Sequence, residues 1–257
     1  MLKNKIKMFL ISLGLVCVII TVSIFGGIGS KGNKAYANSN SNKSTYSMKQ
    51  QSVDLQDVKD VLKGIQGSDV KPNSRGRILI YSSHSCEKNV DSSILEVSSD
   101  LTKKLEKKGF NVEHDKSLFA DMQGYNRSYY SSGAMLDKKD LSKYVLVIDC
   151  HMDSTPSKMT TNYKDMDVAK LMFPNLSENP NLKAETNIVD RIKKGLNTFS
   201  DKIYRENVTH YRRGINFYSL NKSPNMILME IGSDKNDFLS CQRANTLVSS
   251  AIERAFK

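Results

Sequence analysis

The chain of 257 residues has only four cysteines, and it contains no CxxC pair and no arginine-rich run. Basic and aromatic residues do not alternate as they do in many nucleic-acid readers, so these absences disfavour a nucleic-acid partner. Cys17 falls in an apolar run, which leaves an odd number of cysteines and a poor disulfide framework for a domain of this size. We therefore expect Cys86, Cys150 and Cys241 to be free or buried.

What the chain has in excess is positive charge, with 38 Lys and Arg against 27 Asp and Glu and a net charge of +11. A basic surface indicates an anionic partner. With nucleic acid disfavoured, the remaining candidates are anionic lipid and a cell-wall polymer that carries carboxylates and phosphates.

The N-terminal region combines three lysines in "MLKNKIK" with an uncharged, apolar or small stretch over residues 8–28. About 20 such residues span a bilayer core, and the preceding lysines favour the cytoplasmic side. The Ala-Tyr-Ala sequence at 35–37 offers a cleavage site for a secretory signal, but the run is longer than usual signal sequences. We favour a retained transmembrane anchor over residues 1–30, which predicts a single-pass membrane protein whose remaining residues face the cell wall.

Residues 31–74 are predicted to form a flexible tether, because the segment begins with an Asn- and Ser-rich stretch that has almost nothing to bury. Apolar residues at helical spacing over 53–66 indicate one short amphipathic helix within it. We place the start of the folded domain near Arg75, so that the domain covers residues 75–257.

Within this domain, strand-like and helix-like patterns alternate, which is typical of an α/β fold with a mostly parallel central sheet flanked by helices. The segment "YVLVID" is a near-continuous apolar run of the kind that a central parallel strand needs. A cap at Asp91 or Ser92 begins the first expected helix. We expect strands at 77–81, 110–112, 144–149, 168–173, 215–218 and 226–231, and helices at 92–108, 188–203 and 237–255.

Three polar side chains stand at the ends of expected strands: His84 follows "ILIYSS", His151 follows "YVLVIDC", and Glu230 ends "MILME". Ligands of open α/β sheets bind beyond the carboxyl ends of the strands, so parallel strands would bring these groups to one rim. Glu87 lies in the same loop as His84. Two imidazoles and a carboxylate are the ligand set of a catalytic zinc site, whereas magnesium and calcium prefer oxygen.

Two alternatives remain open at this point, namely an ordinary polar loop and a thiol nucleophile. The spacing alone leaves the metal site and the ordinary loop about equally supported. A nucleophilic cysteine needs a lowered pKa and a base. Cys150 follows an apolar strand on the face opposite to His151, as a buried hydrophobe would. Cys86 lies in the loop of His84 and could contact a metal.

Five segments, in order from about Gly76 to the C-terminus, resemble stage II sporulation protein P. This family consists of membrane-anchored peptidoglycan hydrolases related to the zinc-dependent N-acetylmuramoyl-L-alanine amidases. The segments are "ILIYSSHSCE", "LEKKGFNVEHD", "GYNRSYYSS", "VIDCHMDS" and "SPNMILMEIGSDKND". No single segment is specific, but five in one order are.

The resemblance implies that His84, Glu87 and His151 bind zinc and that Glu230 is the catalytic carboxylate that activates water. The implied reaction cleaves the amide between N-acetylmuramic acid and the L-alanine of the stem peptide, and the family is also credited with cutting cross-linked peptides. It further implies a role in engulfment during sporulation. Peptidoglycan is then the substrate, and stage II sporulation proteins D and M are partners at the membranes around the developing spore.

The chain departs from the family pattern at three positions. Ser82 replaces the first histidine of His-x-His, Met152 replaces an arginine, and Ser233 replaces a glycine. Loss of such supporting groups typically costs 10–100-fold in affinity or activity. A peptidoglycan-binding or partner-binding homologue with weakened or no activity is therefore the alternative. A third possibility is a tethered scaffold that acts only through partners.

The tyrosines of the third segment and the aspartate of the fourth segment each have two interpretations. Tyr125 and Tyr129, in "GYNRSYYSS", either line a saccharide or peptide groove or form a turn. Asp149 either orients a ligand histidine or simply ends a strand.

Overall fold

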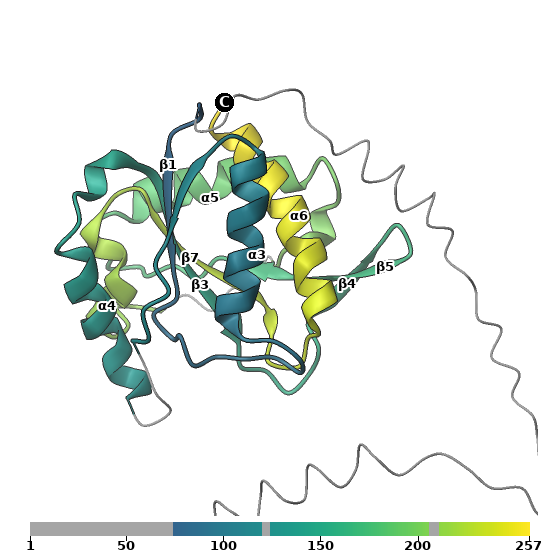
Figure 1. Cartoon of the computed structure of the whole chain (residues 1–257), viewed down its shortest axis with the longest axis horizontal. Coiled ribbons are helices and arrows are strands. Elements are labelled where there is room, and N and C mark those ends of the chain that lie inside the picture. The colour runs from purple at the N-terminus through teal and green to yellow at the C-terminus, as the bar shows by residue number, and fades with distance from the viewer. Residues whose placement is uncertain (1–73, 120–123, 206–210) are drawn as a thin grey trace, which may run out of the picture. The chain divides into compact units, whose positions relative to one another are not determined.

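A five-stranded sheet with the order β2-β1-β3-β7-β6 forms the centre of the fold (Figure 1). The structure is a computed structural model that describes residues 74–119, 124–205 and 211–257. The first four strands pair in parallel and β6 pairs antiparallel with β7, so the predicted α/β fold with a mostly parallel sheet is confirmed. The strands are β1 (Arg77–Tyr81), β2 (Asn111–His114), β3 (Tyr144–Asp153), β6 (Leu171–Met172) and β7 (Met226–Ser233).

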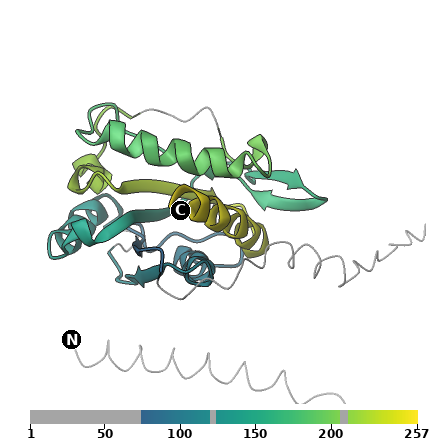
Figure 2. The same cartoon turned by 90° about the horizontal axis from the view of Figure 1, so that it is seen from above.

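Helices cover both faces of this sheet because side chains alternate along each strand. Ile78 and Ile80 pack into the core beneath α3, α5 and α6, whereas Leu79 and Tyr81 pack toward α4 and the 3₁₀ helix η4. Figure 1 shows α3 beside α6, and Figure 2 shows α5 beside α6. The helices are α3 (Ile94–Lys107), α4 (Ser128–Leu136), α5 (Leu182–Leu196), α6 (Phe238–Ala255) and η4 (Asn216–Lys222).

Shorter elements connect these layers. Strands β4 and β5 form an antiparallel hairpin, which projects beyond α6 in Figure 1. The bounds of the shorter elements are β4 (Thr160–Tyr163), β5 (Met166–Ala169), η1 (Tyr125–Arg127), η2 (Leu141–Lys143) and η3 (Asp201–Ile203).

Side-chain caps begin the two helices nearest the carboxyl ends of the strands. The Ser93 hydroxyl accepts from the backbone N–H of Glu96, whose carboxylate in turn accepts from the Ser93 N–H, and this capping box starts α3. The predicted cap at Asp91 or Ser92 is therefore wrong by one or two residues. Asp237 caps α6 by accepting from the Ser240 N–H at 2.7 Å.

Three predicted elements differ from the structure. The helix expected over 188–203 begins earlier, at Leu182, and ends earlier, at Leu196, where the Thr198 hydroxyl and the Phe199 N–H satisfy the last carbonyls of α5. The strand expected over 168–173 is divided between β5 and β6. The strand expected over 215–218 is wrong, because this segment turns through left-handed backbone conformations in η4.

The predicted N-terminal anchor, the tether and the helix at 53–66 lie outside the described residues. Within the part that the structure describes, none of the helices has the length and apolar character needed to cross a bilayer. The domain boundary near Arg75 stays a prediction.

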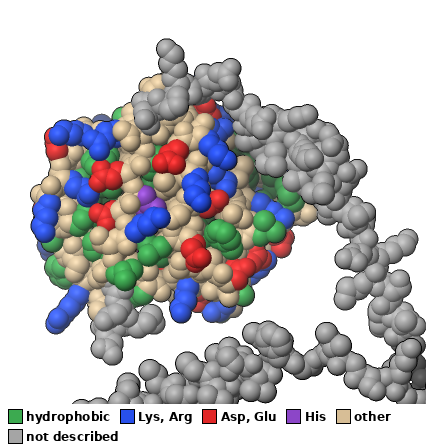
Figure 3. All heavy atoms as spheres, viewed as in Figure 1, with side chains coloured by type: hydrophobic (Ala, Val, Ile, Leu, Met, Phe, Trp, Pro, Cys, Tyr) green, Lys and Arg blue, Asp and Glu red, His purple; other side chains and the backbone are tan. Residues whose placement is uncertain are grey.

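The surface in Figure 3 shows lysine and arginine side chains interspersed with acidic ones. Glu253, for example, pairs with both Arg75 and Lys108 at 3.1 Å. Cys150 and Cys241 are buried free thiols, as expected.

Glu185, in the first turn of α5, is 2% exposed and accepts a hydrogen bond from Asn179 at 2.9 Å. Burial raises the pKa of Glu185 to about 7 despite this bond, whereas an unfolded glutamate titrates near pH 4.3. The folded pKa is the higher one, so stability that is present below about pH 4 is lost as the pH rises to about 7.

We expect Glu185→Gln to remove this loss while keeping a partner for Asn179. The melting temperature of the variant should rise relative to the unsubstituted protein by roughly 5–10 °C between pH 5 and pH 8. Glu106→Gln, on the exposed side of α3, is the matched control and should show no such trend. A constant difference across this pH range would show that Glu185 does not titrate in the folded protein.

Candidate metal centre

The parallel pairing of β1, β3 and β7 brings the predicted site residues to one rim of the sheet. Tyr81 pairs with Asp149, and His151 pairs with Glu230 on the next strand. Paired residues point to the same face, so His151 and Glu230 both lie on the face covered by α4 and η4. Cys150 directly precedes His151 on β3, so its side chain points to the other face of the sheet and packs in the core there.

The loop after β1 supplies the other two predicted ligands. The Glu87 N–H donates to the carbonyl of His84 at 2.9 Å, and this turn places their side chains together. The loop is closed further along by Asn89, whose Oδ1 accepts from the backbone N–H groups of Asp91 and Ser92. Val90 donates to the carbonyl of Asn236, which ties the loop to the segment before α6.

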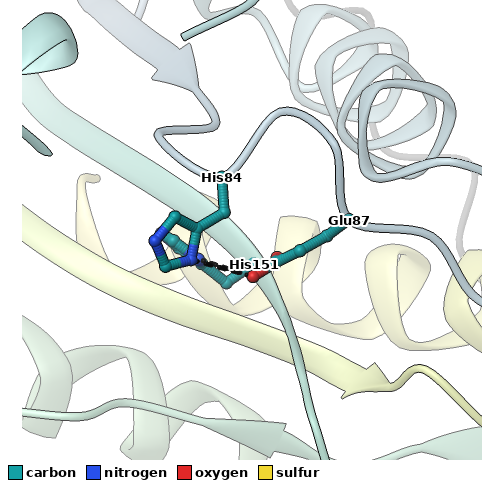
Figure 4. A group of neighbouring side chains, drawn as sticks. All are labelled: His84, Glu87 and His151. Atoms are coloured by element: carbon teal, nitrogen blue, oxygen red, sulfur yellow. Dashed lines mark hydrogen bonds and ion pairs between the residues drawn. The ribbon is translucent and has the colours of Figure 1, made fainter. Parts of the chain in front are cut away.

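His84, Glu87 and His151 point toward one another, as Figure 4 shows. The Oε1 of Glu87 lies 3.0 Å from the Nδ1 of His84 and 3.4 Å from the Nδ1 of His151. One ligand atom from each residue falls within 4.8 Å of the others. The structure thus gathers all three predicted ligands, and their role in binding metal remains a prediction.

The far side of the His151 ring is held by a buried carboxylate. Its Nε2 lies 3.0 Å from the Oδ1 of Asp149 and 3.0 Å from the hydroxyl of Ser83. Asp149 also accepts from the Ser83 N–H and Oγ at 2.8 and 2.7 Å. Asp149 therefore orients His151, and the alternative that it ends a strand is wrong, because β3 continues to Asp153. Ser83 was not predicted, because no sequence pattern distinguishes it from the serines beside it.

Aromatic side chains from the segment before α4 cover the imidazoles. The Tyr125 ring stacks on His84 at 3.6 Å between centroids, and its hydroxyl donates to the Oε1 of Glu87 at 2.6 Å. Tyr129 lies 4.7 Å from His84 and 6.1 Å from His151. The turn is confirmed by η1, which contains Tyr125, and a saccharide or peptide groove at these tyrosines stays a prediction.

The electrostatics favour a negative Glu87. Burial would raise its pKa, but His151 and His84 outweigh that effect and hold the pKa of Glu87 at about 2. Burial would lower the pKa of His151, yet Asp149 and Glu87 raise it well above its usual value. Burial dominates for His84 and lowers its pKa. In the absence of a metal, a proton on His151 therefore balances the carboxylates.

Glu230 differs from Glu87 because no donor among the described residues satisfies its buried Oε2. Burial raises the pKa of Glu230 to about 8, and Glu87 and Asp153 add to this effect against His151. A carboxyl group poised near neutral pH is suited to general acid and base chemistry.

The sequence matches the family described as Stage II sporulation protein P (SpoIIP) over residues 27–253. The chain belongs to this family. Its membership supports a role as a peptidoglycan hydrolase in sporulation. No curated protein sequence matches the chain.

Solved structures that are similar to this one include three amidases. The CwlD amidase from Clostridioides difficile, solved with the GerS lipoprotein, is 15% identical with a TM-score of 0.49, over 70% of this chain and 98% of that one. AmiC2 from Nostoc punctiforme is 16% identical with a TM-score of 0.42, over 72% and 96%. Ami1 from Mycobacterium smegmatis is 9% identical with a TM-score of 0.41, over 72% and 96%.

The departures from the family pattern have different structural consequences. The Met152 side chain packs in the core opposite the site, and only its backbone N–H reaches the site, where it donates to the Oε2 of Glu87 at 2.9 Å. The Ser82 hydroxyl is buried and has no hydrogen-bond partner among the described residues. Ser233 donates to the Oδ1 of Asn236 from its N–H at 2.9 Å and from its hydroxyl at 3.0 Å.

The residues present fit a small, nitrogen-preferring divalent cation. Ligand atoms about 2.0–2.2 Å from a tetrahedral zinc lie about 3.3–3.6 Å apart, close to the distances from Glu87 to the two imidazoles. With Nδ1 of His84 facing Glu87, the Nε2 on the far side of that ring is buried and has no partner among the described residues, so His84 lacks the support that His151 has. Asp149 on the far nitrogen of His151 is the support that ligand histidines usually have.

We expect Asp149→Asn to weaken zinc binding about 10- to 100-fold, because the neutral amide no longer stabilises or orients the His151 ring. Competition with a chromogenic chelator measures this affinity. His114→Gln is the control, since His114 contacts Ser98 at the end of β2 and should leave the affinity unchanged. Equal affinities for Asp149→Asn and the unsubstituted protein would remove Asp149 from the metal site.

Proposed function

We propose that this chain is a zinc-dependent peptidoglycan hydrolase that cleaves the amide between N-acetylmuramic acid and L-alanine during engulfment. The observation that carries this proposal is the convergence of His84, Glu87 and His151 beside an unsatisfied Glu230 carboxyl. Membership of the stage II sporulation protein P family supports the substrate class. We propose that the same site would also cleave the peptide bonds of cross-linked stem peptides.

The chain's own residues have distinct tasks in this proposal. His84, Glu87 and His151 would hold the ion, which would supply Lewis-acid chemistry toward water and a carbonyl oxygen. The Oε2 of Glu230 accepts the proton of the attacking water and returns it to the leaving amine. Tyr125 keeps bulk water from the ring of His84 by stacking on it.

The proposed setting follows from the N-terminal sequence. An anchor over residues 1–30 would hold the domain at the outer side of the cell membrane, within reach of the wall. Stage II sporulation proteins D and M are the proposed partners there.

A homologue that binds peptidoglycan and cuts it weakly is the second candidate. The Ser82 hydroxyl favours it, because this buried group stands unpartnered where the family pattern has a histidine.

Glu230→Gln separates these candidates. We expect the variant to keep near-stoichiometric zinc and to lose about 10²- to 10⁴-fold in cleavage rate, because the amide cannot accept a proton. Zinc analysis and mass spectrometry of digested muropeptides measure the two effects. Glu106→Gln is the control for removing a carboxylate elsewhere.

New amino groups on L-alanine, released only when zinc is present, are the expected products of the unsubstituted protein. Binding of peptidoglycan without such products at any zinc concentration would reject the hydrolase and favour the binding homologue.

A further inference from the structure

The segment that replaces an expected strand, residues 215–218, has an unusual backbone. Four consecutive residues, Asn216, Phe217, Tyr218 and Ser219, have φ values of 50°, 52°, 50° and 61°. Side chains other than glycine rarely adopt this left-handed region, and a run of them carries an energetic cost. Strain of this kind persists where the surroundings enforce it, and it gathers at binding sites.

The surroundings of this turn enforce it through α4. The Asn216 side-chain amide and the Ser219 hydroxyl both donate to the carbonyl of Tyr129, at 3.2 and 3.3 Å. Gly133, one turn later on α4, makes room for them, because a Cβ there would lie 3.2 Å from the Asn216 amide nitrogen. The turn is thus fastened to the residue that covers the imidazoles.

The turn places the Tyr218 ring against the backbone of Gly214, which has no side chain. Gly214 has a φ of +63°, and a Cβ on it would lie 2.6 Å from the Cζ of Tyr218. The ring is half-buried, lies 4.7 Å from Tyr129, and meets the half-exposed Tyr211 edge-on at 5.8 Å. Tyrosine rings therefore continue from His151 through Tyr129 to the surface.

We propose that Tyr218 and Tyr211, backed by the buried ring of Tyr129, form an aromatic platform that binds the sugar ring of N-acetylmuramic acid beside the metal centre. This inference rests on the proposed function, because the lactyl group places the pyranose ring only a few bonds from the amide that is cut. The C–H groups of a sugar ring stack on aromatic faces, and the tyrosine hydroxyls bond to its polar rim.

The charges around the platform favour the sugar over the stem peptide, which carries carboxylates. Arg212 pairs with Glu178, and Arg213 lies over the Phe217 ring at 5.1 Å from its centroid. Lys222, at the end of η4, pairs with Asp137. The cations that flank the platform in the described residues are therefore already engaged.

Tyr218→Leu tests the platform in the full chain with Glu230→Gln present, so that no ligand is cut. The probes are the disaccharide of N-acetylglucosamine and N-acetylmuramic acid, with its lactyl carboxyl group converted to a primary amide, and the free peptide L-alanyl-D-glutamate. Isothermal titration calorimetry measures both affinities without depending on a tyrosine signal that Tyr218→Leu would itself remove. We expect the disaccharide to bind about 5- to 10-fold more weakly to Tyr218→Leu, with zinc content and peptide affinity unchanged.

Three further variants refine the test. Tyr218→Phe keeps the ring and should retain most of the affinity, whereas Gly214→Ala should displace the ring and weaken binding as Tyr218→Leu does. Tyr130→Leu, an exposed tyrosine on α4, is the matched control and should have no effect.

Unchanged disaccharide affinity in Tyr218→Leu would overturn the platform, and so would a loss of peptide affinity in place of disaccharide affinity. These results would not affect the proposed hydrolase activity if the unsubstituted protein cleaves peptidoglycan and Glu230→Gln does not. Weakened disaccharide binding, together with no cleavage by the unsubstituted protein, would support the platform in a binding homologue.

Discussion

The in-register parallel pairing of β1, β3 and β7 is the constraint on which the candidate site depends. It sets His151 beside Glu230, two residues beyond the level at which β1 ends with Tyr81 opposite Asp149. A slip of one residue would turn every side chain of a strand to the other face. His151 would then enter the core in place of Cys150. The alternation of side chains along each strand therefore both fills the two cores and orients the site residues. The same strand pairing is required for the fold and for the site.

The electrostatics of the site follow from its burial. A buried carboxylate is costly unless donors satisfy it, and Glu87 meets both imidazoles, the Met152 N–H and the Tyr125 hydroxyl. His151 is held between Glu87 and Asp149, which favours a positive charge at this position. Protons and a divalent cation would compete for these ligands, because metal binding requires neutral imidazoles.

Glu230 stands apart from this network, since its Oε2 has no donor among the described residues and burial raises its pKa to about 8 in the absence of a bound cation. The left-handed turn over residues 216–219 is a second local departure from unstrained structure. Proteins usually keep such departures at functional positions and compensate for them nearby. Here the compensation comes from the Tyr129 carbonyl and from the space at Gly133 and Gly214.

The sequence by itself determined the elements whose periodicity is local, namely β1, β3, α3, β7 and α6, and with them the α/β class. It also placed His84 and Glu87 in one loop and His151 and Glu230 at strand ends. Only the tertiary structure decided where α5 ends, that 215–218 turns rather than extends, and that Ser83 and Tyr218 border the site. These outcomes depend on contacts between residues far apart in the chain, such as Ser83 with Asp149, which no local pattern encodes.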